Sequence, residues 1–185
     1  MFAERAEIAP QLRVDDHAAF ALVVSTHQDA LVNYLSLLCG CRAQAQDLAQ
    51  ETFIRLYVNA ARYEEQGRLR PYLFRIATNL ARSAHRRAQR RRLLAQALGR
   101  EPEQEAARDP YAALVGQEQQ SRLWRALERL PLHLRAPLLL YEVEGLSYLD
   151  IARALDCRVG TVKSRLSRAR ARLGQLLARA GGDDG

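Results

Sequence analysis

Two amphipathic segments separated by a very short break lie in the last third of the sequence, within Glu144–Leu173. The apolar residues of each segment recur at the spacing of one helix face, with steps of 4, 3 and 4 residues in the second. These residues are Ile151, Ala152 and Leu155 in the first segment and Val162, Leu166, Ala169 and Leu173 in the second. Only Asp156–Arg158 separate the two stripes, which leaves room for nothing but a tight turn. The pattern predicts a helix-turn-helix, whose second helix typically enters the major groove of DNA.

The charge of the chain agrees with a polyanionic partner. The 185 residues carry a formal net charge of +7, and all but one of the 28 basic residues are arginine, the exception being Lys163. The guanidinium group forms forked contacts with phosphates and with guanine edges, and it stacks on bases. The length fits one or two small domains, and the basic charge suggests a polyanionic partner, although many basic proteins bind no nucleic acid.

Helical periodicity extends over most of the chain, and strand-like alternation persists nowhere. We expect helices over Asp16–Gly40, 43–60 and Pro71–Arg92, followed by helical pattern from Gln117 to Leu177. Proline suits the first position of a helix, where its missing N–H costs little. The predicted fold class is all-α.

A change of composition divides the helical pattern into two parts. The segment Gly99–Pro110 has two prolines, four acidic residues and no large apolar residue, as expected of an exposed linker. We therefore predict two small helical domains joined by a flexible linker, the second of them containing the helix-turn-helix. The predicted ranges are 15–92 for the first domain, 93–117 for the linker and 118–177 for the second domain.

The second predicted helix has two different faces. One is apolar, and the opposite face combines acidic and amide groups with two apolar residues, Ile54 and Val58. The polar members of that face are Asp47, Gln50 and Glu51. A solvated acidic face would account for the charges but would leave Ile54 and Val58 exposed without purpose. An acidic rim around apolar residues favours docking on a basic protein surface, whereas carboxylates repel phosphate.

The third predicted helix is rich in arginine. Seven arginines and no acid lie between Arg75 and Arg92, which exceeds what the helix dipole would favour at a C-terminus. The expected inner stripe consists of Leu73, Ile76, Ala77, Leu80 and Ala84. The expected outer side consists of Arg75, Thr78, Asn79, Arg82 and Arg86, continued by Arg87 and Arg90–Arg92. Three aromatic residues flank the start of the helix, namely Tyr63, Tyr72 and Phe74. Arginines beside aromatic rings can hold single-stranded nucleic acid, although Phe74 can equally belong to the core.

The C-terminal part contains two more helices before the helix-turn-helix. Leu123, Leu127 and Leu130 are the expected inner stripe of one, with Trp124 alongside. The other covers 132–143, and Pro137 should bend or shorten it.

The second helix of the helix-turn-helix presents small polar groups and cations opposite its apolar stripe. Thr161, Ser164 and Arg168 are the candidates for contacts to base edges, with Thr161 alternatively capping the helix. The candidates for phosphate contacts are Lys163, Arg165 and Arg172.

No catalytic or metal-binding pattern is present in the sequence. The four histidines have no cysteine or carboxylate at ligand spacing, and phosphate-binding loops and nucleophile elbows are absent. Cys39 and Cys41 could form a redox pair or half a metal site, but small apolar residues at a helix end stopped by Gly40 are the more frequent case. We therefore expect a protein without enzymatic activity, cofactor, metal or small-molecule substrate.

The expected compartment is the bacterial cytoplasm or an equivalent reducing one. The N-terminal apolar stretch Ala18–Val24 is too short to span a membrane, and no secretory signal precedes it. Three cysteines form no even disulfide framework. We expect no direct insertion into a membrane.

Three segments together resemble a known family. Asp47–Tyr57 (DLAQETFIRLY), Arg70–Arg87 (RPYLFRIATNLARSAHRR) and Gly145–Arg170 (GLSYLDIARALDCRVGTVKSRLSRAR) are similar, in this order, to the conserved segments of bacterial extracytoplasmic-function (ECF) sigma factors. This is the minimal two-domain group of the sigma-70 family. The resemblance extends over about 150 residues, from Asp15 to Leu173.

The resemblance implies a subunit that directs RNA polymerase to promoters and helps to melt them. The first domain looks like sigma region 2, and its Asp47, Gln50 and Glu51, with Ile54 on the same face, would bind the clamp helices of the largest polymerase subunit. Residues implied to bind the −10 element are Tyr63, Tyr72, Arg75, Asn79, Arg82, Arg86 and Arg87. Residues of the region 4-like domain implied to bind the −35 element are Arg158, Thr161, Lys163, Ser164, Arg165 and Arg168. Further implied partners are the β flap of the polymerase and an anti-sigma factor.

The sequence departs from the family pattern at a few positions. Tyr72 stands where tryptophan is common, and Asp156 and Arg158 stand where the turn often has glycine and proline. Aspartate tolerates the left-handed conformation better than most residues, so the turn is expected to survive. One rival is a helix-turn-helix regulator that acts without polymerase, which would have no use for the acidic face. Another is an interaction protein that mimics these helices, which would not depend on Arg165 or Arg168.

Overall fold

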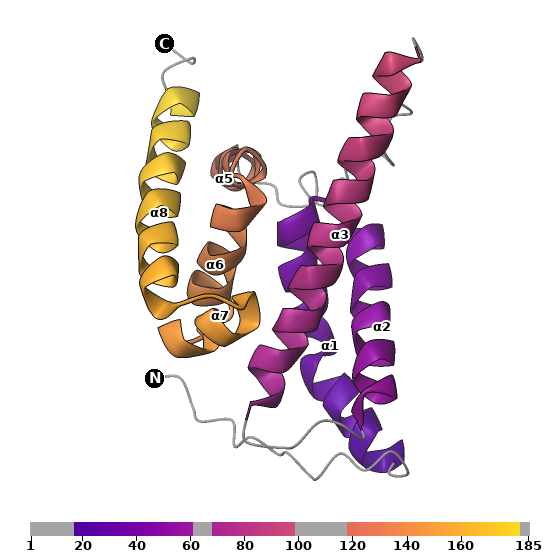
Figure 1. Cartoon of the computed structure of the whole chain (residues 1–185). Helices are drawn as coiled ribbons and strands as arrows, with labels where there is room; N and C mark the ends of the chain where they lie inside the picture. Colours follow the sequence, from indigo (N-terminus) through magenta and orange to yellow (C-terminus); the bar gives the residue numbers. More distant parts are fainter. Residues whose placement is uncertain (1–16, 61–67, 99–117, 182–185) are drawn as a thin grey trace.

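The computed structural model describes residues 17–60, 68–98 and 118–181, and it contains only helices and their connections within these ranges. The helices of the first part are α1 (His17–Cys39), α2 (Arg42–Val58) and α3 (Leu69–Ala97). Those of the second part are α5 (Glu118–Glu128), α6 (Leu132–Glu142), α7 (Tyr148–Leu155) and α8 (Val159–Gly181). The predicted all-α class is therefore confirmed (Figure 1). None of these helices is long and apolar enough to cross a membrane.

The first three helices pack on one another around an apolar core. α1 contributes Leu31, Tyr34, Leu35 and Leu38, all nearly inaccessible to solvent. The Tyr34 hydroxyl lies 2.8 Å from the Thr78 hydroxyl of α3, and the Tyr34 ring meets Phe74 edge-on at 5.2 Å. The placement of Thr78 on the outer side was therefore wrong. A threonine can turn inward when its hydroxyl is satisfied, as it is here by Tyr34 and by the carbonyl of Phe74.

The connection between α1 and α2 is a tight turn. α1 ends at Cys39, and Gly40 follows with φ +75, a conformation that favours glycine. Burial raises the pKa of the Cys39 thiol to about 12, so this thiol is protonated and unreactive at neutral pH. Among the described residues no three histidine, cysteine or acidic side chains form a group that could hold a metal ion. The interpretation of these cysteines as small apolar residues at a helix end fits this environment better than a redox pair does.

α3 is longer than the sequence pattern predicted. It begins at Leu69 rather than at Pro71, and it continues to Ala97, beyond the predicted end at Arg92. Its distal half projects past the other helices, as Figure 1 shows, and Leu93, Leu94 and Leu98 are exposed there.

The second group of helices packs around its own leucine-rich face. α6 continues through Pro137, and Leu138, Leu139 and Leu140 next to it are buried. In α5 the prediction for Leu123 was wrong, because this side chain is 41% exposed while Ala126 and Leu127 are buried. The small side chain of Ala126 lets α5 pack closely on its neighbours. The buried face of α5 is therefore rotated relative to the expected stripe, with Ala126 buried in place of Leu123.

The helix-turn-helix prediction is confirmed by α7 and α8. The Ser147 side chain caps α7 by accepting the N–H of Asp150, and Asp156 ends α7 with φ 51 in the left-handed conformation. Aspartate takes the place of the usual glycine at this turn, as expected from its tolerance of that conformation. The predicted stripe of α8 faces inward, with Val162, Leu166 and Ala169 at 0 to 1% exposure.

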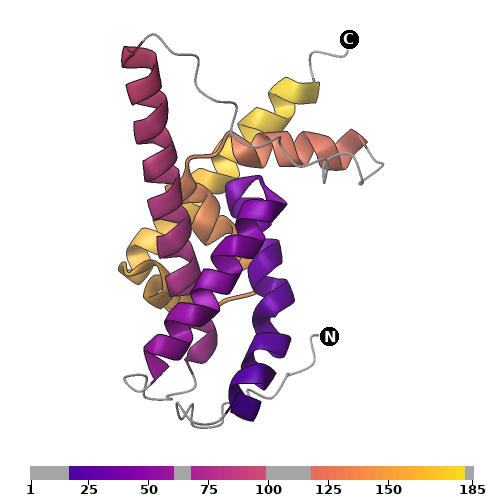
Figure 2. The ribbon, with the colours of Figure 1, turned by 90° about the vertical axis from the view of Figure 1, so that its right-hand side faces the viewer.

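The two helical groups contact each other directly. α3 packs against α7, and α1 packs against α6 and α5, so the buried apolar residues of both groups form one contiguous cluster. In the view of Figure 2, α5 crosses near the end of α1 and the start of α2, while α7 lies beside the start of α3.

Candidate nucleic-acid interface

The outer face of α8 presents the predicted −35 residues in a compact group. Lys163, Ser164 and Arg168 are exposed, and Thr161 and Arg165 are half-buried at its edges. Arg158 immediately precedes the helix, and its backbone carbonyl accepts the N–H groups of Thr161 and Val162 at 2.9 and 3.2 Å. The exposed Arg158 side chain therefore lies at the positive N-terminal end of α8, where an approaching phosphate would be favoured.

The side chains of this face are ordered along the helix. The Ser164 hydroxyl donates to the Thr161 carbonyl at 3.0 Å, and Arg168 Nε donates to the Ser164 carbonyl at 3.2 Å. Arg168 thus folds back toward the N-terminal half of α8, beside Ser164. Thr161 is the third residue of the helix, so it is not the N-cap and its hydroxyl belongs to the surface. Short hydroxyls beside a forked cation form a surface able to donate to base edges.

The outer face of α3 presents the predicted −10 residues. Arg75, Asn79, Arg86 and Arg87 are exposed, and Tyr72 and Arg82 are half-buried. Tyr63 lies outside the described residues. Phe74 is 2% exposed and packs on Tyr34, so it belongs to the core and not to the nucleic-acid surface.

This face is cationic over its whole length. Arg86 Nη2 donates to Ser83 Oγ at 3.1 Å, and Arg90 is exposed one turn further on. Hydroxyl and amide side chains are few between the arginines, so the face offers charge more than base-edge readout.

The acidic and apolar face of α2 is exposed as predicted. Ile54 is 50% and Val58 is 73% exposed, with Asp47 and Gln50 exposed beside them. Glu51 pairs with Arg55 at 2.7 Å, which adds a cation to this face that the sequence pattern had not assigned to it. Exposed branched apolar side chains surrounded by polar groups are typical of a protein-binding surface.

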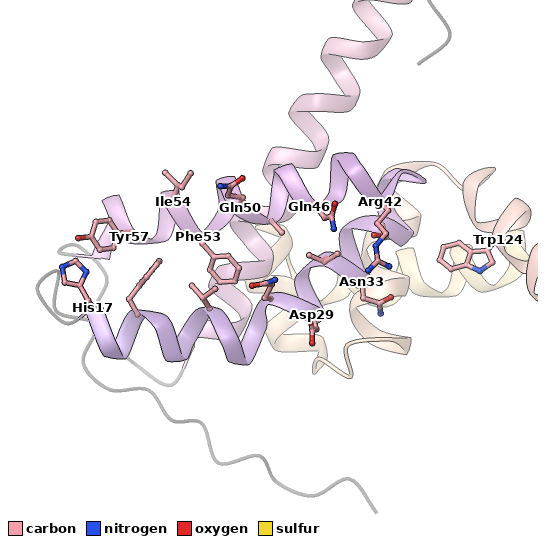
Figure 3. A pocket seen from close by; sticks show the side chains of 16 residues that line it. His17, Asp29, Asn33, Arg42, Gln46, Gln50, Phe53, Ile54, Tyr57 and Trp124 are labelled. Carbon is pink, nitrogen blue, oxygen red and sulfur yellow. The ribbon is translucent and has the colours of Figure 1, made fainter. Parts of the chain in front are cut away.

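A groove continues from this face between α1 and α2. It encloses ≈ 910 Å³, and Figure 3 shows Gln50, Phe53 and Ile54 along one wall and Trp124 of α5 at the far end. Phe20 and Val24 of α1 line the opposite wall. The polymerase-binding face predicted from α2 is thus the rim of a larger concave surface.

The structure also brings together residues that the sequence pattern did not single out. Arg70 of α3 donates to the carboxylate of Glu144 at 3.1 Å and to its backbone carbonyl at 2.6 Å. Arg135 of α6 donates to the carbonyl of Leu38 at the end of α1. These partners are 74 and 97 residues apart in sequence, and no local periodicity connects residues at such separations.

Two family models match the chain over the parts that form these surfaces. Residues 23–91 match sigma-70 region 2, and residues 120–173 match sigma-70 region 4. The first range contains α2 and most of α3, and the second contains α6, α7 and the first part of α8. The class of protein is therefore that of sigma-70 factors.

Individual relatives narrow this class. The chain is 35% identical over 159 residues to the ECF RNA polymerase sigma factor SigE of Mycolicibacterium smegmatis, covering 85% of this chain and 61% of that protein. It is 32% identical over 171 residues to the ECF RNA polymerase sigma-E factor of Haemophilus influenzae, covering 88% and 89%. The sigma factor RpoE of Bartonella quintana, solved in complex with the anti-sigma factor NepR, is similar with TM-score 0.70 and 30% identity, over 86% of this chain and 96% of that one.

The chain belongs to the ECF sigma factors of the sigma-70 family. Its function is to direct RNA polymerase to promoters. The predictions of family and of function are thereby confirmed, whereas the assignment of single residues to polymerase or DNA remains a prediction.

Proposed function

We propose that three separate surfaces of this chain divide the work of promoter-directed initiation. The exposed face of α2 around Asp47, Gln50, Glu51 and Ile54 binds the clamp helices of the largest polymerase subunit. The outer face of α3 binds the −10 element, and the outer face of α8 binds the −35 element. One observation carries this proposal: the chain has an acidic and apolar face on α2 in addition to two cationic helices. A simple repressor needs cationic helices to bind DNA, but it has no use for such a protein-binding face.

The −10 surface acts mainly through charge. Arg75, Arg82, Arg86 and Arg87 neutralise phosphates, and Tyr72 with Asn79 lies where bases would stack or be hydrogen-bonded. Tyr63 belongs to the same proposed surface on the strength of the resemblance alone. The surface holds one strand as the duplex separates.

The −35 surface acts mainly through readout. Thr161, Ser164 and Arg168 contact base edges, while Arg158, Lys163 and Arg165 contact phosphates. Each domain contacts few bases, so tethering both to the polymerase raises the effective concentration at the second element. Free protein therefore binds promoter DNA weakly.

The chain performs no chemistry of its own and works in the cytoplasm with the polymerase, without a cofactor or a small-molecule substrate. A sigma factor similar to it over 86% of this chain was solved bound to an anti-sigma factor, which supports a partner of that kind here. The region 4-like domain contacts the β flap of the polymerase, as the resemblance implies. The predicted domain ranges are 15–92 and 118–177, with the linker over 93–117. Because α3 continues to Ala97, we place the start of the linker after that helix.

Binding of core polymerase tests the proposal. The Asp47→Arg variant should lose affinity for core polymerase by at least about tenfold, because it places a cation opposite a basic surface. Glu142→Arg is the matched control, since Glu142 is a half-exposed acid on α6 that pairs with Arg170 of α8 at 2.8 Å. Both variants should keep the helical circular dichroism of the parent.

Transcription from genomic templates completes the test. Core polymerase with the parent protein or Glu142→Arg should initiate at specific promoters, and Asp47→Arg should not. If Asp47→Arg bound core and supported initiation like the control, the α2 face would not be the polymerase contact. If the parent directed no initiation at any genomic promoter, the whole proposal would fail.

A further inference from the structure

The last turns of α3 carry an apolar group that the described residues leave uncovered. Leu93, Leu94 and Leu98 are 66%, 62% and 61% exposed, on a helix end that projects past the other helices (Figure 1). Exposed leucines gathered in this way mark an interaction surface. Arg87 and Arg91 precede Leu94 and Leu98 on the same side of the helix, because steps of three and four residues return to one face. The α3 tip, residues 87–98, is therefore apolar and basic at once.

The exposed face of α2 has the complementary chemistry. Its apolar residues, Ile54 and Val58, are 50% and 73% exposed, and its acids, Asp47 and Glu51, precede them on the same side. Glu51 is already paired with Arg55 at 2.7 Å, which makes Asp47 the principal acid of this face. A basic and apolar surface is the kind of partner that such a face fits. The α3 tip is a surface of that kind within the same chain.

The two faces match in spacing as well as in charge. In each stripe the first charged residue precedes the first apolar residue by seven positions, and the two apolar residues are four positions apart. Positions 47, 51, 54 and 58 of α2 thus correspond to positions 87, 91, 94 and 98 of α3. Two parallel helices in this register bring acids opposite cations and apolar side chains opposite apolar side chains. The matched stretch is about 17 Å long, at about 1.5 Å per residue.

The two faces cannot meet within one molecule. α2 ends and α3 begins at the same end of the first helical group, so the two helices run in opposite directions (Figure 1). Val58 is the last residue of α2, whereas the exposed leucines lie at the far end of a helix of 29 residues. That helix is about 43 Å long, at about 1.5 Å per residue. The partner of each face therefore belongs to a second copy of the chain.

We propose that the free protein forms a symmetric dimer in which the α3 tip of each copy lies parallel to α2 of the other. Val58 and Leu98 mark opposite ends of the α2–α3 pair, so one two-fold axis brings both contacts together and closes the assembly. Each copy then covers the α2 face of its partner. This consequence for polymerase binding rests on the proposed function, whereas the dimer is a property of the chain alone.

The dimer is expected to be weak and to regulate by mass action. Each contact consists of a few side chains over a short length of helix, and interfaces of small area are typical of transient complexes. As the concentration of free protein rises, a growing fraction of its α2 faces is covered. Dilution uncovers these faces again. The amount of protein competent to bind polymerase therefore rises less than in proportion to the total.

Analytical ultracentrifugation of the full chain at low salt, without DNA or polymerase, tests the dimer. The parent should sediment as a monomer at about 1 μM and as a dimer toward about 1 mM, the range in which weak contacts become populated. Leu94→Glu places a carboxylate inside the apolar contact and should weaken dimerisation at least about tenfold. Leu149→Glu is the matched control, because Leu149 is 52% exposed on α7, away from both faces. All three proteins should share one helical circular dichroism spectrum.

The parent and its control give clear contrary outcomes. A parent that stays monomeric at about 1 mM would overturn the proposal. Growth beyond a dimer would overturn the symmetric arrangement, since a contact that does not close on itself continues into longer chains. Equal weakening by Leu149→Glu and Leu94→Glu would show that the α3 tip has no special part in association.

Mixing two charge variants tests the proposed register. Asp47→Arg alone and Arg87→Asp alone set like charges against each other in both contacts of a dimer, so each should dimerise at least about tenfold more weakly than the parent. An equal mixture should dimerise as the parent does. One contact of the mixed dimer is then unchanged, and the other has its two charges exchanged. A mixture as weak as its components would contradict the pairing of Asp47 with Arg87.

Binding of core polymerase separates the dimer from the proposed function. Leu94→Glu should bind core polymerase like the parent in dilute solution, because Leu94 belongs to neither the polymerase face nor the DNA faces. At protein concentrations where the parent is dimeric, it should bind more core than the parent does. If the parent dimerises and core binding is the same for both proteins at every concentration, the dimer does not cover the polymerase face. If Asp47→Arg weakens the dimer but binds core like the parent, the assignment of the α2 face to polymerase fails and the dimer stands.

Discussion

Helices α3 and α8 are both rich in arginine, yet their outer faces differ in what stands between the cations. On α8, Ser164 and Ser167 are exposed beside Lys163 and Arg168. On the distal half of α3, every exposed position from Arg86 to Arg92 except Gln89 carries an arginine. Short hydroxyl groups let the backbone of a helix approach base edges, whereas long cations in series contact phosphates.

The two helices also differ in their surroundings. The start of α3 lies against α7 and contributes Arg70 and Arg75 to the interface between the two helical groups. None of the predicted −35 residues from Lys163 to Arg168 has an ion pair across that interface among the described residues. Positive charge alone therefore does not define the role of a helix. In our proposal, sequence readout belongs to α8 and strand holding belongs to α3.

The largest effect is expected for Arg168→Ala in the promoter-bound polymerase. Loss of a forked hydrogen-bond pair to a base should cost about 1–3 kcal/mol at the preferred −35 sequence and relax the choice of base at one position. Competition binding against −35 variants measures both effects. Equal losses on all sequences would show that Arg168 contacts phosphate. The proposed difference between α8, which reads bases, and α3, which contacts phosphates, would then be wrong.

A uniform effect is expected for Arg86→Ala combined with Arg87→Ala on α3. Affinity should fall by a similar factor for every promoter sequence, and the slope of log K against log salt should decrease by about 0.7–0.9 for each phosphate that the variant no longer neutralises. Titrations between low and physiological salt measure the slope. A change in base preference without a change in slope would contradict the assigned role of α3.

A smaller effect is expected for Tyr34→Phe, which tests how α3 is held in place. The change removes the hydrogen bond to Thr78, while the Thr78 hydroxyl keeps the Phe74 carbonyl as its partner. The free energy of unfolding should decrease by about 1 kcal/mol, as measured by denaturant titration. No change would mean that ring packing alone fixes α3, as the apolar stripe does for α8.

The smallest effect is a pH dependence of stability. Burial raises the pKa of the Glu144 carboxyl, although Arg70 acts in the opposite direction, so the folded protein binds that proton more tightly than the unfolded chain does. The free energy of unfolding should therefore rise as the pH falls through the raised pKa and decrease as the pH rises above it. His27 works in the opposite direction, because burial and Arg70 lower its pKa.

Comparison with Glu144→Gln isolates the contribution of the carboxyl. Above the raised pKa of Glu144 the parent should be less stable than Glu144→Gln, and at lower pH the two stabilities should converge. Denaturant titration across the pH range is the measurement. Parallel curves for the two proteins would contradict the assignment of the effect to Glu144.

Local patterns of the sequence were sufficient for the helices and for the faces of α2 and α8. The left-handed turn at Asp156 followed from the conformational tolerance of aspartate, and the buried stripe of α8 followed from helical spacing. Thr78 and Leu123 were misplaced because a satisfied hydroxyl can be buried and a neighbouring alanine can replace a leucine where helices pack closely. Both errors arise from tertiary packing, which periodicity does not describe.

The interface between the two helical groups could not be predicted from those local patterns. Arg70 belonged to a recognised motif, but nothing near it in sequence pointed to Glu144. The sequence around Arg135 does not distinguish it from other helical arginines. Its role depends on the ends of α1 and α5, which only the folded structure brings next to it. Long-range pairs of this kind depend on how finished helices pack.

Mapping of transcript starts after overproduction of the protein tests the central claim most directly. We expect new starts preceded by two shared elements near −35 and −10, with the Arg168→Ala variant changing the upstream element and leaving the downstream one unaltered. Starts that share no upstream sequences, or an Arg168→Ala variant that uses the same −35 element with the same preference, would contradict the account.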